Sequence, residues 1–181
     1  MSTRARPDAA RRGLVATGAL ALAAPAILHA QSPGEPSQRR PWPAGRPTPA
    51  VALPEWEGGT WRLDAQRGKV VAINFWAGWC EPCRAEMPSL ELLAQRYEPR
   101  GLRIVAANFR ETDAAIRRFL DRMPFTLPIL RDADGGVAKA WGVRVFPSTA
   151  VIGRDGRAAF VVTGEIDWTG ELARRWIESV L

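Results

Sequence analysis

The stretch VVAINFWAGWCEPCRAEMP, residues 70–88, constrains the fold more than any other part of the chain. It opens with seven residues that are apolar or β-branched except for Asn74, which is typical of a strand buried on both faces. After three further residues come Cys80 and then Cys83, and a helical pattern follows in which Pro88 predicts a kink. The sequence therefore predicts a buried strand that leads directly into a helix, with both cysteines at the junction.

The rest of the chain alternates between strand and helix patterns. After the cysteines, Leu90, Leu93, Ala94 and Tyr97 recur at helical spacing and give one apolar face. Similar patterns predict a hairpin around residues 53–63, strands at 102–109, 148–153 and 158–162, and helices at 112–123, 137–141 and 173–180. This order predicts an α/β domain in which a central mixed β-sheet is flanked by helices, with an N-terminal β-hairpin extension.

The first 30 residues have the three parts of an export signal. Arg11 and Arg12 end a basic region, residues 13–28 form an apolar run, and small residues precede a cleavage site after Ala30. A membrane-spanning helix needs about 20 apolar residues, so this run is short for a span. We predict that residues 1–30 are a signal peptide cleaved after Ala30, with an uncleaved membrane anchor as the alternative. The predicted location is the periplasm, where disulfides can form and persist.

The next segment, residues 31–50, contains six prolines and almost no aliphatic side chains. Such a composition buries too little apolar surface to offset the conformational entropy lost on ordering. We therefore predict a disordered proline-rich tether over residues 31–50, followed by a single folded domain over residues 51–181.

The net charge of +6 is a poor indication of nucleic-acid binding. Arg4, Arg6, Arg11 and Arg12 against Asp8 supply three of those charges within the predicted signal. The remaining excess is spread along the chain without a basic run or an interleaved series of aromatic residues. We therefore expect no nucleic-acid partner.

The position of the two cysteines favours thiol chemistry. Cys80 lies where the free N–H groups and the dipole of a helix N-terminus stabilise an anion. Pro82 suits the first helical turn, because the N–H that it lacks is not needed there. We predict that Cys80 is exposed and attacks as a thiolate, whereas Cys83 is shielded and resolves the mixed disulfide.

Three neighbouring side chains bear on this chemistry. Glu81 places a negative charge near the thiolate, which favours the disulfide and makes the reduced protein a better electron donor, unless solvent screens that charge. Glu86 lies three residues beyond Cys83 on the same helical side, where it either takes the proton of that thiol or is simply solvated. Trp79 is either a packing residue or a platform for substrate.

Two thiolates also allow other interpretations. A structural zinc site needs about four ligands, and the one histidine, His29, lies in the predicted signal, so no such metal site is expected. A Cu(I) carrier stays an alternative, because soft sulfur ligands suit that ion and Met87 is nearby. A purely structural bridge is a weaker explanation, since linking residues three apart closes a very small loop.

The segments FWAGWCEPCRAEMP and GVRVFPSTAVIGRDGR, in this order, resemble the thioredoxin superfamily and specifically its exported TlpA/ResA-type branch. The resemblance spans roughly residues 51–181 and implies a thioredoxin-like fold. It also implies that Pro147 is cis and lies beside the cysteines, and that the backbone of Phe146 is open to pair with an extended substrate segment.

The resemblance changes the interpretation of Glu86, which completes the CxPCxxE pattern of the ResA-type proteins and so acquires a functional role. Asn74 stands where thioredoxin has a buried acid, and an amide cannot exchange a proton. If proton transfer to or from Cys83 needs a carboxylate, Glu86 must supply it.

By the same resemblance, the protein is a periplasmic thiol-disulfide oxidoreductase that donates electrons from a dithiol. Its substrates would be disulfides in other exported proteins, such as apocytochrome c before haem attachment or a copper-site assembly protein. It would need no bound cofactor besides the Cys80–Cys83 disulfide. Its electrons would come from a membrane thiol reductant of the DsbD/CcdA type.

Overall fold

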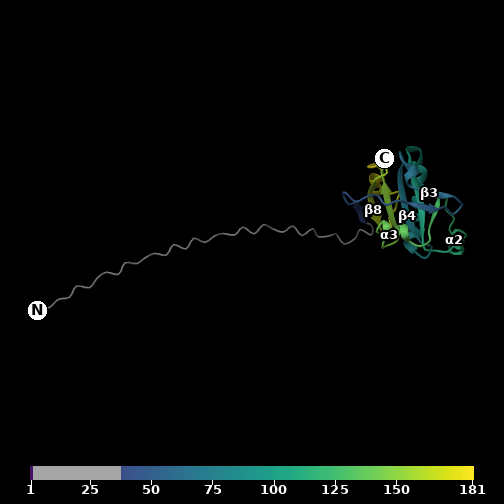
Figure 1. The fold of residues 1–181 in the computed structure, drawn as a ribbon, viewed down its shortest axis with the longest axis horizontal. Coiled ribbons are helices and arrows are strands. Elements are labelled where there is room, and N and C mark those ends of the chain that lie inside the picture. The colour runs from purple at the N-terminus through teal and green to yellow at the C-terminus, as the bar shows by residue number, and fades with distance from the viewer. Residues whose placement is uncertain (2–37) are drawn as a thin grey trace. The chain divides into compact units, whose positions relative to one another are not determined.

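The computed structural model describes Met1 and residues 38–181 (Figure 1). Residues 2–30 of the predicted signal peptide and residues 31–37 of the predicted tether lie outside the described residues. Among the helices that are described, none is both long and apolar enough to cross a membrane.

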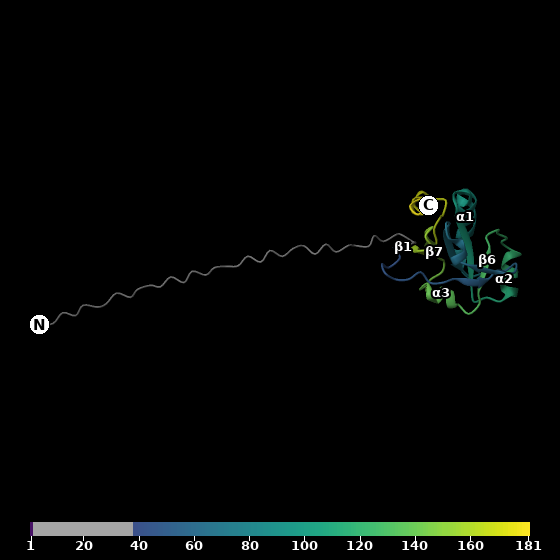
Figure 2. The same ribbon diagram turned by 45° about the horizontal axis from the view of Figure 1, so that its top comes forward.

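A six-stranded mixed sheet with the order β1-β8-β7-β4-β5-β6 forms the centre of the domain. β4, β5 and β6 are parallel, whereas β7, β8 and β1 follow on the other side of β4 in antiparallel pairs. In Figure 2, β1 and β7 lie towards one side of the domain and β6 towards the other. The strands of this sheet are β1 (Gln38–Pro41), β4 (Val70–Trp76), β5 (Leu102–Phe109), β6 (Ile129–Asp132), β7 (Ser148–Ile152) and β8 (Ala158–Thr163). A separate antiparallel pair, β2 (Ala52–Pro54) and β3 (Thr60–Arg62), forms the predicted N-terminal hairpin.

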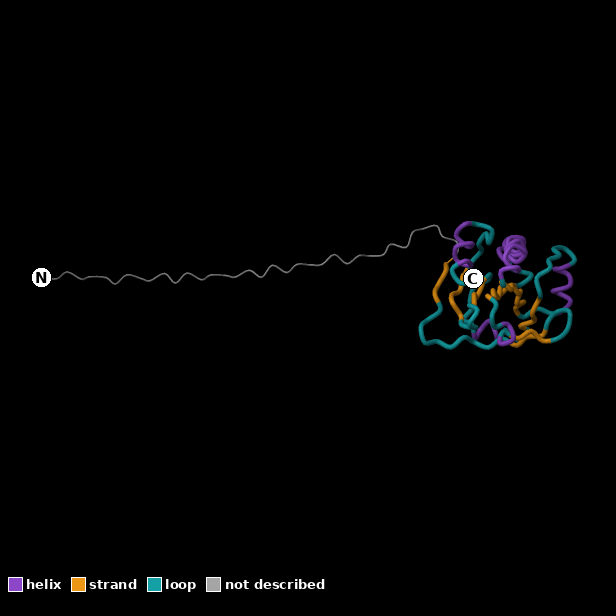
Figure 3. Tube along the Cα trace, turned by 90° about the horizontal axis from the view of Figure 1, so that it is seen from above, coloured by secondary structure: helices purple, strands orange, loops and turns teal. Residues whose placement is uncertain are grey.

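Helices cover both faces of the sheet, as the view from above shows (Figure 3). On one face, α1, α2 and α4 bury their apolar side chains, and on the other face α3 and the β2–β3 hairpin do so. The helices are α1 (Glu81–Tyr97), α2 (Asp113–Leu120), α3 (Gly136–Ala140) and α4 (Glu171–Glu178), with short 3₁₀ turns at Asp64–Gln66 and Glu98–Arg100. The arrangement confirms the predicted α/β class and the central mixed sheet flanked by helices.

β4 lies in the middle of the sheet and determines where the cysteines are placed. All seven of its side chains are buried, as the apolar run predicts, and they alternate between the two cores. Phe75 near its end pairs with Ser148 at the start of β7. The segment that enters β7 therefore lies beside the loop that leaves β4, although the two are far apart in sequence.

Two strands were not expected from the sequence. β6 is four residues long and pairs with β5 at its outer edge. β1 pairs with β8 along the opposite edge of the sheet, so the prediction of a disordered tether over residues 31–50 is wrong for residues 38–50. An edge strand tolerates proline and exposed arginines, because only one side of its backbone is hydrogen-bonded. The folded region thus includes residues well before the predicted start at residue 51.

Residues 42–50, which we call the strap, continue from β1 towards β2 and are also held in place. The Trp42 indole packs on that of Trp141, with ring centroids 5.1 Å apart. Further along, the Ala158 N–H donates a 2.8 Å hydrogen bond to the Thr48 hydroxyl. These contacts hold the strap in place, although its composition offers little aliphatic surface to bury.

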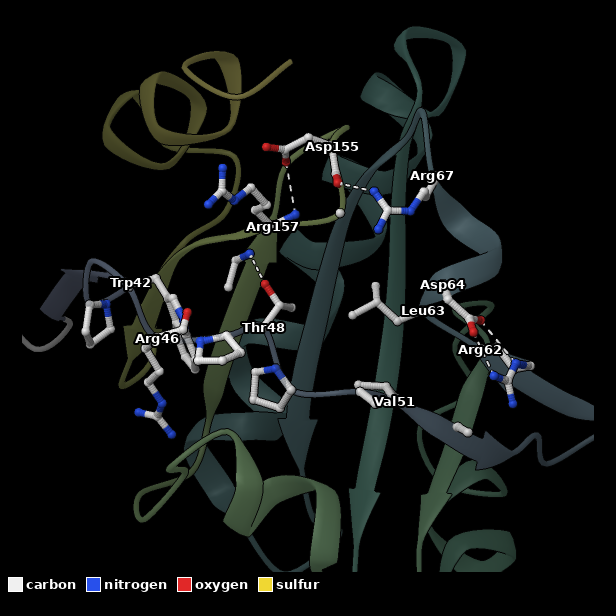
Figure 4. Close-up of a pocket in the computed structure, with 18 of the residues that line it drawn as sticks. Trp42, Arg46, Thr48, Val51, Arg62, Leu63, Asp64, Arg67, Asp155 and Arg157 are labelled. Atoms are coloured by element: carbon white, nitrogen blue, oxygen red, sulfur yellow. Dashed lines mark hydrogen bonds and ion pairs between the residues drawn. The ribbon is translucent and has the colours of Figure 1, made fainter.

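A cavity of about 560 Å³ lies between the strap, the β7–β8 turn and Arg67 (Figure 4). Three of its arginines already have partners, and one of them, Arg46, donates a 3.1 Å hydrogen bond to the Ala140 carbonyl. Arg62 binds the Asp64 carboxylate through hydrogen bonds of 3.1 and 2.7 Å, and Arg67 Nη1 donates to the Asp155 carbonyl at 2.5 Å. All three arginines precede β4, whereas Cys80 follows it, so we assign this cavity to the support of the strap and not to the cysteines.

The strap contacts predict a measurable contribution to stability. Trp42→Ala removes the indole that packs on Trp141, and we expect the free energy of unfolding to fall by about 2–3 kcal/mol. Urea denaturation of the oxidised protein measures the change. Trp79→Ala is the control, because Trp79 is 65% exposed and its loss should cost below about 1 kcal/mol. Equally small losses in both variants would favour a loose tether after all.

Candidate active site

Cys80 and Cys83 form a disulfide at the N-terminus of α1, with their Cα atoms 5.3 Å apart. Cys80 is the N-cap residue, and the Cys83 N–H donates to its Sγ over 3.2 Å. Pro82 lies in the first turn, as predicted. The Cys83 N–H and the N-terminus of the helix therefore point at the Cys80 sulfur, which is the arrangement that stabilises a thiolate once the disulfide is reduced.

The two cysteine residues differ little in exposure. Cys83 is fully buried, as predicted, but Cys80 retains only 4% of its surface, so the prediction of an exposed Cys80 is wrong for the disulfide form. Both cysteines belong to the core beneath α1, and the Cys80 sulfur is turned towards the Cys83 N–H. Cys80 still has the larger accessible surface of the two, which agrees with its predicted role as the attacking residue.

The loop between β4 and Cys80 is fixed by a side chain that sequence reasoning missed. Glu111 Oε2 accepts the Gly78 N–H at 2.6 Å and the Asn108 side-chain amide at 2.7 Å. A Cβ at position 78 would lie 3.2 Å from a Glu111 oxygen, so glycine permits this close approach. Since β4 and β5 are parallel neighbours, an acid just after β5 falls next to the loop after β4. That topological signal was available in the sequence.

The predicted substrate-binding residues lie together beside the disulfide. Trp79 is exposed, and its ring meets that of Phe146 edge-on, with centroids 5.9 Å apart. The Phe146–Pro147 peptide bond is cis, which confirms that prediction. Within the described part of the chain, the N–H and carbonyl of Phe146 take part in no backbone hydrogen bond. They are therefore free to pair with an extended segment of another protein.

Glu86 is buried one helical turn beyond Cys83, with only 2% of its surface exposed. Its Oε1 accepts a 2.6 Å hydrogen bond from the Asn74 amide. Its Oε2 accepts from the Trp168 indole N–H at 3.3 Å and from the Ile166 N–H at 3.4 Å. The interpretation of Glu86 as a solvated helix glutamate therefore does not hold.

This environment changes the acidity of the Glu86 carboxyl. Burial raises its pKa from 4.5 to about 8, although the hydrogen bonds from Asn74, Trp168 and Ile166 act in the opposite direction. The charge of Glu165 adds a smaller upward effect. A group that titrates near neutral pH can both accept and return a proton, which is what exchange with a neighbouring thiol requires.

Known proteins with similar sequences carry out this chemistry. The family model described as AhpC/TSA family matches residues 44–161. Thiol-disulfide oxidoreductase ResA from Geobacillus thermodenitrificans is 35% identical over 136 residues, which cover 75% of this chain and 77% of that protein. The chain belongs to the AhpC/TSA family. Within this family, the likeness to the ResA proteins identifies the chain as a thiol-disulfide oxidoreductase.

Solved structures agree with the fold. A DsbE-type thiol:disulfide interchange protein from Chlorobium tepidum matches with a TM-score of 0.69 and 28% identity, covering 75% of this chain and 96% of that one. A secreted disulfide oxidoreductase from Mycobacterium tuberculosis, homologous to Escherichia coli DsbE, matches with a TM-score of 0.61 and 25% identity, over 71% and 96% of the two chains. The predicted thioredoxin-like fold of this AhpC/TSA family member is confirmed.

Glu81 and Met87, which the sequence analysis also named, both lie on α1. Glu81 is exposed in the first turn of α1, so its effect on the reduction potential stays a prediction. Met87 is buried in the same core as the two cysteines. Within residues 38–181, no group of three or more His, Cys, Asp or Glu side chains is arranged to hold a metal ion. A Cu(I) site made of the two thiolates alone is a matter for experiment.

The raised pKa of Glu86 predicts how the stability of the oxidoreductase depends on pH. Between about pH 4.5 and 8 the folded protein keeps the Glu86 proton that the unfolded chain releases, so stability falls as pH rises through this window. We expect the wild type to lose about 2–4 kcal/mol more than Glu86→Gln does between pH 5 and 8.

Urea denaturation of the oxidised proteins measures this difference, because the disulfide keeps both thiols from titrating. Glu91→Gln is the control, since Glu91 also lies on α1 but on its exposed side, where it binds Thr126. Parallel stability curves for the wild type and Glu86→Gln would contradict the raised pKa.

Proposed function

We propose that this oxidoreductase is a periplasmic dithiol donor that reduces disulfides in other exported proteins. The observation that carries the proposal is the buried carboxyl of Glu86, one turn beyond Cys83, with its pKa raised by burial to about 8. Cys83 must lose its proton before it can attack, and its sulfur is shielded from solvent. A nearby base that titrates in the right range supports this role.

The reaction begins when the Cys80 thiolate attacks one sulfur of the substrate disulfide. A mixed disulfide forms, and the first substrate sulfur leaves as a thiolate that takes up a proton. Cys83 then gives its proton to Glu86 and attacks the Cys80 sulfur. This step restores the Cys80–Cys83 disulfide and releases the second substrate thiolate, which is protonated in turn. Two electrons have then passed from the dithiol to the substrate, and no bound cofactor is involved.

Substrate contacts follow from the exposed groups around the pair. An extended segment of the substrate pairs with the free N–H and carbonyl of Phe146, next to Pro147. The exposed Trp79 ring, in contact with the Phe146 ring, supplies an apolar platform for the same segment. The segment that carries the substrate disulfide is thereby held over the Cys80 sulfur.

Two features favour electron donation over disulfide formation. Glu81 lies between the cysteines and adds negative charge beside the thiolate of Cys80, which disfavours the ionised dithiol relative to the disulfide. The single histidine of the chain, His29, lies in the predicted signal, so no imidazolium of the folded domain offsets that charge. The charge of Glu81 therefore shifts the pair towards the disulfide, which makes the reduced protein the better electron donor.

The proposed location follows from the export signal predicted over residues 1–30, and the secreted relative from M. tuberculosis supports it. A membrane thiol reductant of the DsbD/CcdA type returns two electrons to the Cys80–Cys83 disulfide after each cycle. The substrates are exported proteins that must be reduced before they receive a metal group, such as apocytochrome c or a copper-site assembly protein.

The Cys83→Ser variant tests the proposed reaction. With its resolving thiol removed, the variant should accumulate a mixed disulfide through Cys80 when it meets an oxidised protein substrate, whereas the metal-free wild type should turn over. Mass spectrometry and non-reducing gels detect the adduct. Stoichiometric Cu(I) binding by the wild type, without disulfide exchange, would instead support the carrier alternative and overturn the proposal.

The role of Glu86 predicts a specific kinetic defect. Glu86→Gln keeps the size of the side chain but removes its basic site, so resolution of the mixed disulfide should slow by about 10²- to 10⁴-fold and lose its pH dependence near 8. Rapid-mixing kinetics of the reduced protein measure this step. Glu81→Gln is the control, because it should shift the reduction potential more than the resolution rate. An unchanged rate and pH profile in Glu86→Gln would remove Glu86 from the mechanism.

A further inference from the structure

A second cavity, of about 320 Å³, adjoins the redox pair between the start of α1 and the helix α2. Gly78 and Arg84 form part of its wall. Gly78 lies two residues before Cys80, a separation of at most about 7 Å along the backbone. Arg84 directly follows Cys83 in α1. A group bound in this cavity therefore lies beside the disulfide.

Three arginines surround the cavity, Arg84 from α1 and Arg118 and Arg122 from the last turn of α2 and the residues after it. All three are exposed, and within residues 38–181 none of them forms an ion pair. Other arginines of the domain, such as Arg103 and Arg131, do pair with acids. The guanidinium groups at this cavity are therefore available to a ligand.

The rest of the lining completes a site for an acidic peptide. Phe119 and Met123 contribute apolar surface. Glu111 is the one acidic side chain among the lining residues, and it already accepts hydrogen bonds from the Gly78 N–H and from Asn108. Three guanidinium groups against this single carboxylate leave an excess of two positive charges around a partly apolar pocket.

We propose that this cavity binds an acidic side chain of the protein substrate, at a position close to the substrate disulfide. Guanidinium groups bind carboxylates through paired, charge-assisted hydrogen bonds, and the apolar part of the lining accommodates the stem of the side chain. Since the cavity wall begins two residues from Cys80, the acidic residue lies within about three residues of the substrate cysteine. The proposal rests on the proposed function, because it names the class of substrate at the same site.

Two disulfide-bonded peptides test the proposal. They differ only at the positions two residues on either side of one cysteine, which are Asp in the first peptide and Asn in the second. We expect the reduced wild type to reduce the Asp peptide with a second-order rate constant about tenfold higher than that for the Asn peptide at low salt. The ratio should approach one at about 0.5 M salt, because salt screens exposed charges.

The double variant Arg118→Gln/Arg122→Gln should bring the ratio of the two second-order rate constants close to one. The matched control is Arg117→Gln/Arg174→Gln, which removes the same charge from α2 and α4 at positions outside the cavity and should keep the ratio. Circular dichroism checks that both variants are folded.

The outcomes separate this proposal from the proposed function. If the wild type reduces both peptides equally well, the acidic preference is wrong and the dithiol donor stands. If it reduces neither peptide, both proposals fail. Loss of the preference in the control variant as well would show a general effect of charge and not a site. A cavity variant that keeps its peptide preference but no longer binds vesicles of anionic phospholipid would assign the arginines to lipid headgroups instead.

Discussion

The hydrogen bond between Asn74 and Glu86 joins the central strand to the redox helix inside the core. A carboxyl group at that depth needs donors, and they come from β4, from Trp168 and from the Ile166 backbone before α4. These contacts fix how α1 is rotated against the sheet, and with it the position of Cys80 at the helix start. Because Asn74 donates without titrating, the buried site contains a single acid, and its proton is not shared with a second carboxylate.

Much of the fold could be predicted because its signals are local. The apolar run of β4, the capped apolar face of α2 and the Asp-Gly turn between β7 and β8 each identify an element within a few residues. β6 and β1 were missed for a physical reason. β1 is polar and β6 has only two apolar residues, so each forms a strand only because the exposed edges of β8 and β5 offer unpaired backbone groups. Sequence segments of this kind take their conformation from a partner that is distant in the chain.

The same distinction separates the site residues that were predicted from those that were not. The two cysteines, Glu86 and the Phe146–Pro147 bond lie in segments whose patterns are specific by themselves. Trp168 acts on Glu86 across 82 positions, and no periodicity in the sequence connects the two. The depth of Glu86 was likewise beyond sequence reasoning, because a glutamate three residues after a buried cysteine is as compatible with the helix surface as with the core.

The pairing of β1 determines where the chain enters the domain. Gln38 lies opposite Thr163, and Thr163 lies opposite Ser148, which in turn pairs with Phe75 near the end of β4. Three strand spacings therefore separate the entry point from the end of β4, or roughly 14 Å across the sheet. The chain thus enters at the same end of the sheet that carries the disulfide.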